Sequence, residues 1–155
     1  MSDEFQPLVL GSASGTAAVL TEPLSLWGGL DPDTGTIIDA HHPQRGSVIA
    51  GNVLVMPFGR GSSSSTSTLL EAVRLGTHPI AIVLAEVDDI LVLGAIVAKA
   101  LYGIIVPVVV LPRSAYDLIR TGDEVEVAEG RFAISRSGEA VVSLKARNRD
   151  AGLIA

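Results

Sequence analysis

The sequence predicts a single α/β domain, residues 1–155, with an accessory antiparallel β-layer or barrel. In the middle of the chain, apolar segments typical of buried strands alternate with helical segments, as in a parallel β-α-β arrangement. The C-terminal part alternates polar and apolar residues around two glycines, as a small antiparallel meander does. A length of 155 residues suffices for one domain with a real core and is short for two.

The expected elements follow one another along the chain. Glycine, proline and aspartate separate four strand-like segments, at 8–12, 17–21, 36–39 and 48–57. The pattern then predicts helix 66–75, strand 80–85, helix 89–101, strand 104–111, a short helix 114–120 and the meander 123–144.

Composition limits the function classes. A net charge of −6, a pI near 4.9 and the lack of a Lys/Arg cluster argue against nucleic-acid binding. The chain has no cysteine, so it offers no disulfide framework and no thiolate ligand for a metal. Hydrophobic residues make up 48% of the chain and charged residues 18%, so we expect part of the surface to meet a partner.

The chain carries no pattern that predicts export or a membrane location. Residues 1–7 are polar and acidic and do not resemble a secretory signal. Residues 90–112 carry Lys99 as their only charge, but Gly94, Gly103 and Pro107 divide them into a buried helix and a buried strand. We therefore expect a cytoplasmic protein without a membrane segment.

The stretch "PFGRGSSSSTSTLLEAVRLG", residues 57–76, places glycines, an arginine and hydroxyls directly before a helix. The first backbone N–H groups of a helix lack partners and lie at the positive end of its dipole, so an anion binds well there. Gly59 and Gly61 allow close approach of a ligand, and Arg60 supplies positive charge. The stretch is not a Walker A loop, because the Gly-Lys-Ser/Thr ending is missing. On its own, the serine run is better explained by one Ser or Thr as a helix N-cap, with the other hydroxyls in a solvated loop.

A second loop, "TEPLSLWGGLDPDTGTIIDAHHPQRG", covers residues 21–46 and carries the only tryptophan. Loops of this length in a compact domain are usually functional or disordered, and its apolar residues argue against disorder. His41 and His42 fit a structural or hydrogen-bonding role better than metal binding, since neighbouring strand residues point to opposite faces. Asp31 and Asp33 could bind a cation, but "DPDTG" is more typical of a turn.

The combination of "PLSLWGGLDPDTGTIIDAHHPQRG", "GNVLVMPFGRGSSSS" and "HPIAIVLAEVDD", in this order, resembles the small, swivelling-domain subunit of the aconitase X family. The resemblance extends from about Val9 to about Arg120 and does not include the C-terminal tail. It implies the swivelling β/β/α domain of aconitases. It also implies a large-subunit partner that holds an iron or iron–sulfur centre and most of the substrate pocket, in agreement with the absence of cysteine here.

The resemblance also implies a site. The Gly-Ser-Ser core of the aconitase loop corresponds to Gly61, Ser62 and Ser63, with Ser62 as the catalytic base. The arginine that follows this core in aconitases is Ser64 here, so Arg60 is only a substitute for it. Gly61, Ser63 and Arg60 are then substrate contacts, to which we add the glycine pair of the tryptophan loop, Gly28 and Gly29; no metal ligand is expected in this chain.

The implied reaction is the dehydration of a hydroxy acid by a hydro-lyase, with the metal as Lewis acid toward the leaving hydroxyl. Two substrates compete within the family: cis-3-hydroxy-L-proline and mevalonate 5-phosphate. A phosphate pocket needs fixed positive charge, and only Arg60 lies near the serines, so we favour the hydroxyproline enzyme. The alternative from another class is a non-catalytic, anion-binding or regulatory module.

Overall fold

The computed structural model describes residues 3–147. Its barrel strands are β1 (Glu4–Val9), β2 (Ala13–Val19), β5 (Val53–Val55), β6 (Ala81–Leu84), β7 (Val108–Val110), β8 (Glu124–Val127), β9 (Arg131–Arg136) and β10 (Glu139–Ala146). A separate two-stranded sheet contains β3 (Leu30–Asp31) and β4 (Thr36–Ile37). The helices are α1 (Leu26–Gly29), α2 (Ser64–Leu75), α3 (Asp89–Tyr102) and α4 (Arg113–Tyr116).

The barrel closes in the order β1-β10-β9-β8-β2-β5-β6-β7. Its β2, β5, β6 and β7 strands are mutually parallel, as the apolar strand pattern predicts. The antiparallel meander β8–β10 is also confirmed, but it is not a separate layer. Because β8 pairs with β2 and β10 pairs with β1, the meander completes the same barrel as the parallel strands.

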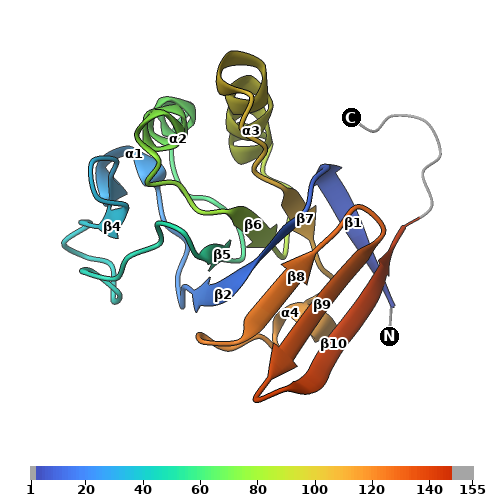
Figure 1. Cartoon of the computed structure of the whole chain (residues 1–155). Helices are drawn as coiled ribbons and strands as arrows, with labels where there is room; N and C mark the ends of the chain where they lie inside the picture. Colours follow the sequence, from blue (N-terminus) through green and yellow to red (C-terminus); the bar gives the residue numbers. More distant parts are fainter. Residues whose placement is uncertain (1–2, 148–155) are drawn as a thin grey trace.

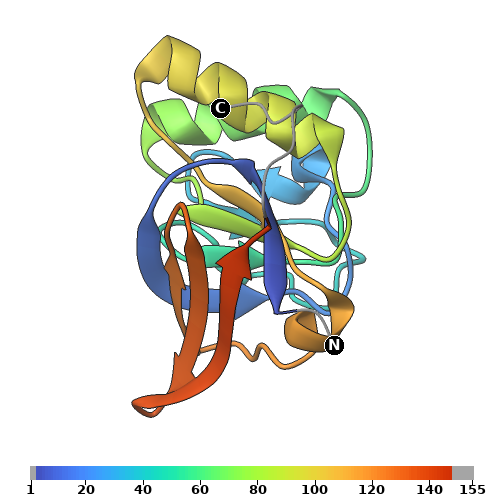
Figure 2. The same ribbon diagram turned by 90° about the vertical axis from the view of Figure 1, so that its right-hand side faces the viewer.

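Two apolar cores lie on opposite faces of the parallel strands. Helices α2 and α3 lie side by side over one face, and the meander lies on the other side (Figures 1 and 2). Alternate residues of β5 point to different cores: Leu54 packs under the helices, whereas Val53 and Val55 lie inside the barrel. The strands are therefore buried on both faces, which explains why they are continuous apolar runs.

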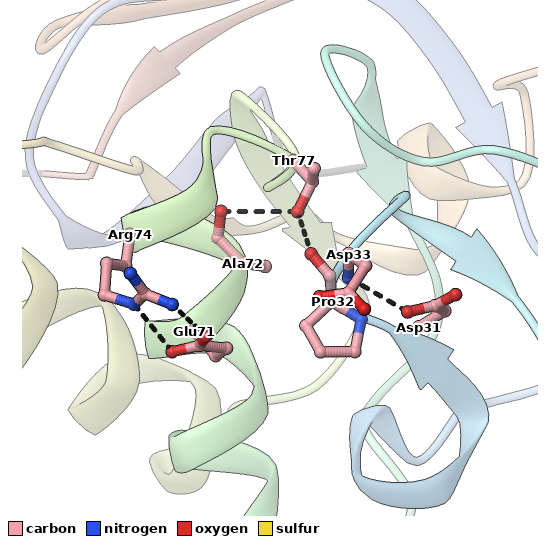
Figure 3. A network of polar contacts seen from close by, with 7 residues as sticks. All are labelled: Asp31, Pro32, Asp33, Glu71, Ala72, Arg74 and Thr77. Atoms are coloured by element: carbon pink, nitrogen blue, oxygen red, sulfur yellow. Dashed lines mark hydrogen bonds and ion pairs between the residues drawn. The ribbon is translucent and has the colours of Figure 1, made fainter.

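The C-terminal end of α2 is fixed to the tryptophan loop (Figure 3). The helix ends at Gly76, whose φ of +76° lies in the left-handed region that glycine tolerates. The next residue, Thr77, donates its hydroxyl to Pro32 O at 2.5 Å. The Arg74 side chain binds Glu71 one turn earlier in the helix. The Thr77–Pro32 bond holds the turn that begins at Asp31 against the end of α2.

Several predicted boundaries are wrong. The predicted strand 8–12 spans the break between β1 and β2, where Gly11 packs so close to Ile105 that a Cβ would lie 2.6 Å from its Cγ2 atom. Strand 48–57 shortens to Val53–Val55, strand 104–111 to Val108–Val110 and helix 114–120 to Arg113–Tyr116. Apolar residues continue beyond the paired segments, so hydropathy alone does not locate the ends. Across residues 3–147, no helix has the length and apolar character needed to span a membrane.

Candidate functional site

Three loops meet at the carboxyl ends of β2, β5 and β6. The first is the start of the tryptophan loop, the second is the segment 56–63 that leads into α2, and the third is the segment 85–88 that leads into α3. Ligands of parallel α/β sheets bind in the crevice outside these strand ends. The topology therefore brings both sequence motifs to the expected edge.

The segment from Gly59 to Ser63, here called the Gly/Ser loop, is held by the tryptophan loop. The backbone N–H of Arg60 donates to Leu24 O at 3.2 Å. Gly61 has a φ of +115°, and a Cβ at this position would clash with the Ser25 hydroxyl. Glycine is thus required at residue 61 by both its conformation and its close packing.

The Gly/Ser loop is also held by the residue that caps α3. Asp88 Oδ2 accepts a hydrogen bond of 2.8 Å from the backbone N–H of Gly59. The other carboxylate oxygen accepts from the N–H groups of Ile90 at 3.0 Å and Leu91 at 3.1 Å. Thr66, in the first turn of α2, donates its hydroxyl to Ile90 O at 3.2 Å. The first turns of both helices and the loop therefore form one connected structure.

Ser62 and Ser63 lie exposed just before α2. The Ser62 hydroxyl accepts a hydrogen bond of 3.3 Å from Ser64 N–H, and Ser63, the N-cap residue, makes no side-chain capping bond. In the part of the chain that the structure describes, the N–H groups of Gly61, Ser62 and Ser63 make no hydrogen bond. The start of α2 thus presents N–H donors and hydroxyls to an incoming anion.

Ser65 differs from its neighbours and corrects the interpretation of the remaining serines as solvated. Its side chain is buried and its hydroxyl accepts a hydrogen bond of 3.3 Å from Trp27 N–H. The serine run therefore contains two environments: exposed hydroxyls at Ser62 and Ser63, and a buried hydrogen bond at Ser65.

The glycine pair of α1 is split between surface and interior. Gly28 is exposed with a φ of +78°, whereas Gly29 is buried. A Cβ at Gly29 would lie 2.8 Å from Leu24 Cδ1, so a larger residue there would displace the Leu24 side chain. The Trp27 side chain is 61% exposed, and its backbone N–H donates to Ser65 in the first turn of α2.

His42 and Asp31 make side-chain hydrogen bonds within the tryptophan loop. His42 is buried, and its Nδ1 accepts from Gln44 N–H at 3.1 Å, so Nε2 carries the hydrogen and donates to Glu22 O at 3.0 Å. His41 is exposed. Asp31 Oδ1 accepts from Asp33 N–H at 2.9 Å, which is the turn that "DPDTG" predicts.

The chain's own side chains do not fit an iron–sulfur cluster. Such clusters are held by cysteine thiolates, and the sequence contains no cysteine. Among residues 3–147 there is also no group of three or more His, Asp or Glu side chains placed to hold a metal ion.

A small cavity lies behind the Gly/Ser loop, lined in part by Arg60, Ser62 and Asp88. Its volume is about 10 Å³, which is enough for roughly one water molecule. Gly28 and Gly29 do not line it. A ligand larger than a water molecule cannot be enclosed here by this chain alone.

Sequence reasoning missed the residues that hold the loop: Leu24, Ser25 and Asp88. Asp88 has a recognisable pattern, since an aspartate directly before an apolar helical segment is a typical N-cap. Nothing in the local sequence indicates that its second oxygen reaches Gly59, which lies 29 residues earlier.

The fold and the site define a swivelling α/β domain whose serine loop is exposed at the carboxyl ends of parallel strands. The chain belongs to the aconitase X swivel domain family, whose model matches residues 4–135. The structure is similar to the crystal structure of holo-form aconitase X from Thermococcus kodakaraensis, with a TM-score of 0.76 and 32% identity, over 86% of this chain and 97% of that one.

Curated relatives of the chain have dehydratase names. The cis-3-hydroxy-L-proline dehydratase of Pseudomonas aeruginosa is 42% identical over 144 residues, which cover 93% of this chain and 24% of that protein. The phosphomevalonate dehydratase small subunit of Methanosarcina acetivorans is 33% identical over 118 residues, 76% of this chain and 78% of that one. The chain thus spans about a quarter of the length of the hydroxyproline dehydratases that it matches.

Proposed function

We propose that this chain is the swivelling subunit of a heteromeric hydro-lyase that dehydrates cis-3-hydroxy-L-proline, with Ser62 as the base. The observation that supports it most is the exposed Ser62 hydroxyl beside three backbone N–H groups that have no partner in residues 3–147. The 42% identity to cis-3-hydroxy-L-proline dehydratase supports the choice of substrate.

The candidate substrates share one chemical pattern. Both cis-3-hydroxy-L-proline and mevalonate 5-phosphate carry a carboxylate, a proton on the adjacent carbon and a hydroxyl on the next carbon. Dehydration removes that proton and that hydroxyl, and negative charge develops beside the carboxylate as the proton leaves. Stabilisation of this charge by fixed donors lowers the barrier.

The Gly/Ser loop provides such donors. The N–H groups of Gly61, Ser62 and Ser63, with the Ser63 hydroxyl and the Arg60 guanidinium, bind the substrate carboxylate. Ser62 Oγ takes the proton from the substrate carbon next to that carboxylate. A free serine hydroxyl is too weak an acid to be deprotonated unaided. The hydrogen bond from Ser64 N–H and the positive end of α2 favour its deprotonated form.

The remainder of the catalytic machinery lies in a partner. The cavity beside the loop is too small for a substrate, so the substrate binds between this chain and a large subunit that closes over it. The chain has no cysteine, and we therefore place the iron or iron–sulfur centre in the large subunit. When bound there, the centre supplies a Lewis acid for the leaving hydroxyl.

Mevalonate 5-phosphate is the second candidate, because the phosphomevalonate dehydratase small subunit of M. acetivorans matches over most of its length. The phosphate needs additional fixed positive charge, and the chain has a net charge of −6 with Arg60 as the cation of the loop. The hydroxyproline substrate carries no such group.

The experiment is to purify the chain with its large subunit anaerobically and to assay the complex on both substrates. We expect turnover of cis-3-hydroxy-L-proline, iron in the complex, and neither activity nor stoichiometric iron in the chain alone. Faster turnover of mevalonate 5-phosphate would identify it as the substrate and would leave the proposed reaction class unchanged. A complex that binds anions and turns over neither substrate would favour the regulatory module.

A further inference from the structure

We propose that Asp88 is a positioning residue for the Gly/Ser loop, because its carboxylate both caps α3 and holds Gly59. This inference rests on the proposed function, in which Ser62 acts on the substrate. Asp88 does not itself touch the substrate; it acts through the backbone three residues before Ser62.

The two oxygens of Asp88 make separate contacts. Oδ1 accepts from the N–H groups of Ile90 and Leu91, and these two bonds satisfy the start of α3. An N-cap residue needs only one such oxygen. Oδ2 is therefore not needed for the helix, yet it makes the shortest of the three bonds, 2.8 Å to Gly59 N–H. The capping role alone does not explain this second contact.

Gly59 packs closely against the same carboxylate oxygen. A Cβ at this position would lie 2.5 Å from Asp88 Oδ2, closer than atoms approach without a shift. The carboxylate oxygen is held from the other side by its helix cap, so it has little freedom to move away. The hydrogen bond between Asp88 and the backbone of residue 59 therefore depends on glycine at residue 59.

The bond to Asp88 restrains the part of the loop that precedes the serines. Pro57 O is fixed by Ala85 N–H at 2.9 Å and Glu86 N–H at 3.0 Å, and Arg60 N–H is fixed by Leu24 O. Gly59 lies between these points, and Asp88 supplies its hydrogen bond. Without it, the chain between Pro57 and Arg60 is free to shift, and displacements of about 1 Å can reduce turnover by roughly 100-fold.

Asp88→Asn separates the two roles. Asparagine caps helices about as well as aspartate, so its oxygen can keep the bonds to Ile90 and Leu91. Its amide nitrogen then faces the Gly59 N–H, donor against donor, and the loop contact is lost. Asp89→Asn is the matched control, because Asp89 is the exposed neighbour in the first turn of α3 and carries the same charge. Gly59→Ala breaks the contact from the loop side and leaves Asp88 intact, which provides a second variant if Asp88→Asn fails to fold.

The first measurement is amide hydrogen exchange of the full chain by NMR, which does not require activity. In Asp88→Asn we expect the Gly59 amide to exchange at least about tenfold faster, while Ile90 and Leu91 stay within about threefold of wild type. An unchanged Gly59 amide would overturn the proposed contact. Equal acceleration at all three amides would show loss of the cap and overturn the separation of roles.

The second measurement is kcat and KM of the assembled complex. We expect Asp88→Asn and Gly59→Ala each to lower kcat by about 10- to 100-fold, with Asp89→Asn within about twofold of wild type. The double variant should be no slower than the slower single variant, because both substitutions remove one contact. Wild-type kcat in Asp88→Asn, or multiplied losses in the double variant, would overturn the positioning role. If the wild-type complex turns over neither substrate, the proposed function fails, and hydrogen exchange still decides whether Asp88 holds the loop.

Discussion

The Ser65 hydroxyl, in the first turn of α2, accepts a hydrogen bond of 3.3 Å from the backbone N–H of Trp27. Ser65 is only 5% exposed, whereas Ser62, three residues earlier, is exposed. The contact connects the tryptophan loop to the helix whose N-terminus carries the candidate base. Serines of the same run therefore have distinct structural environments, and their substitution should have distinct effects.

Ser65→Ala should destabilise the fold and leave turnover of the folded complex within a few-fold of wild type. The substitution removes the acceptor of the Trp27 N–H, and an unsatisfied, partly buried donor costs about 1–2 kcal/mol of unfolding free energy. Denaturant unfolding measures the change. Ser67→Ala is the control, since Ser67 is exposed on the same helix and its loss should change stability by less than about 0.5 kcal/mol. Equal stability of the two variants would contradict the role of Ser65.

Trp27 should be buried by the large subunit. Trp27, Phe58 and Val87 are 61%, 39% and 52% exposed, and each belongs to one of the three loops that meet at the site. We expect Trp27→Ala to weaken association with the large subunit by about 2 kcal/mol or more without changing the stability of the isolated chain. Calorimetric titration measures this, with Leu118→Ala, a 51% exposed residue beyond α4, as the control. Equal affinities of the two variants would place the interface elsewhere.

Asp123 should contribute to stability above about pH 4. Its hydrogen-bonded ion pair with Arg136, at 2.7 and 2.8 Å, holds the pKa of the Asp123 carboxyl below its ordinary value. Because the folded-state pKa is depressed, this stabilisation is fully present above the unfolded pKa, about 3.8, and is lost as the pH falls through the folded pKa. Asp123→Asn should therefore unfold more easily at pH 7, and its stability should change less on acidification. Asp117→Asn, which breaks an exposed ion pair with Arg113, should change little at any pH.

Tyr116→Phe should leave the fold at least as stable as wild type. The Tyr116 hydroxyl is buried without a hydrogen-bond partner in residues 3–147, and burial raises the pKa of Tyr116 to about 12. Removal of an unpaired hydroxyl should leave the unfolding free energy equal or raise it by up to about 1 kcal/mol. Above pH 10 the wild type should lose stability, because the unfolded state releases the proton first. Thermal unfolding at pH 7 and pH 11 tests both, and a clear loss of stability in Tyr116→Phe at pH 7 would reveal an unrecognised partner.

The part of the fold set by local sequence was predictable. Alternating apolar and helical segments indicated the parallel strands, and the periodic residues up to Gly76 indicated α2 almost to its observed ends. The predicted meander followed from the alternation around Gly130 and Gly138. The two glycines and the hydroxyls before α2 likewise indicated the position of the candidate site.

The contacts between distant segments were not predictable. Whether the meander forms a layer or closes the barrel depends on the pairing of β2 with β8, which no local pattern encodes. The burial of Ser65 depends on Trp27, and the bond of Asp88 to Gly59 depends on the packing of α2 beside α3. A residue with ordinary local chemistry acquires such a role only from its tertiary neighbours.

In the proposed mechanism, the Ser62 hydroxyl performs chemistry and does not merely cap α2. The direct measurement is kcat of the anaerobically assembled complex with Ser62→Ala, alongside its Tm and iron content, with Ser67→Ala as the control. We expect Ser62→Ala to assemble and retain iron but to lose about 10²- to 10⁴-fold in kcat, as when a positioned acid–base group is removed, with Ser67→Ala unchanged. A Ser62→Ala complex that turns over normally and has only lost about 1 kcal/mol of stability would identify Ser62 as a helix cap and contradict the account.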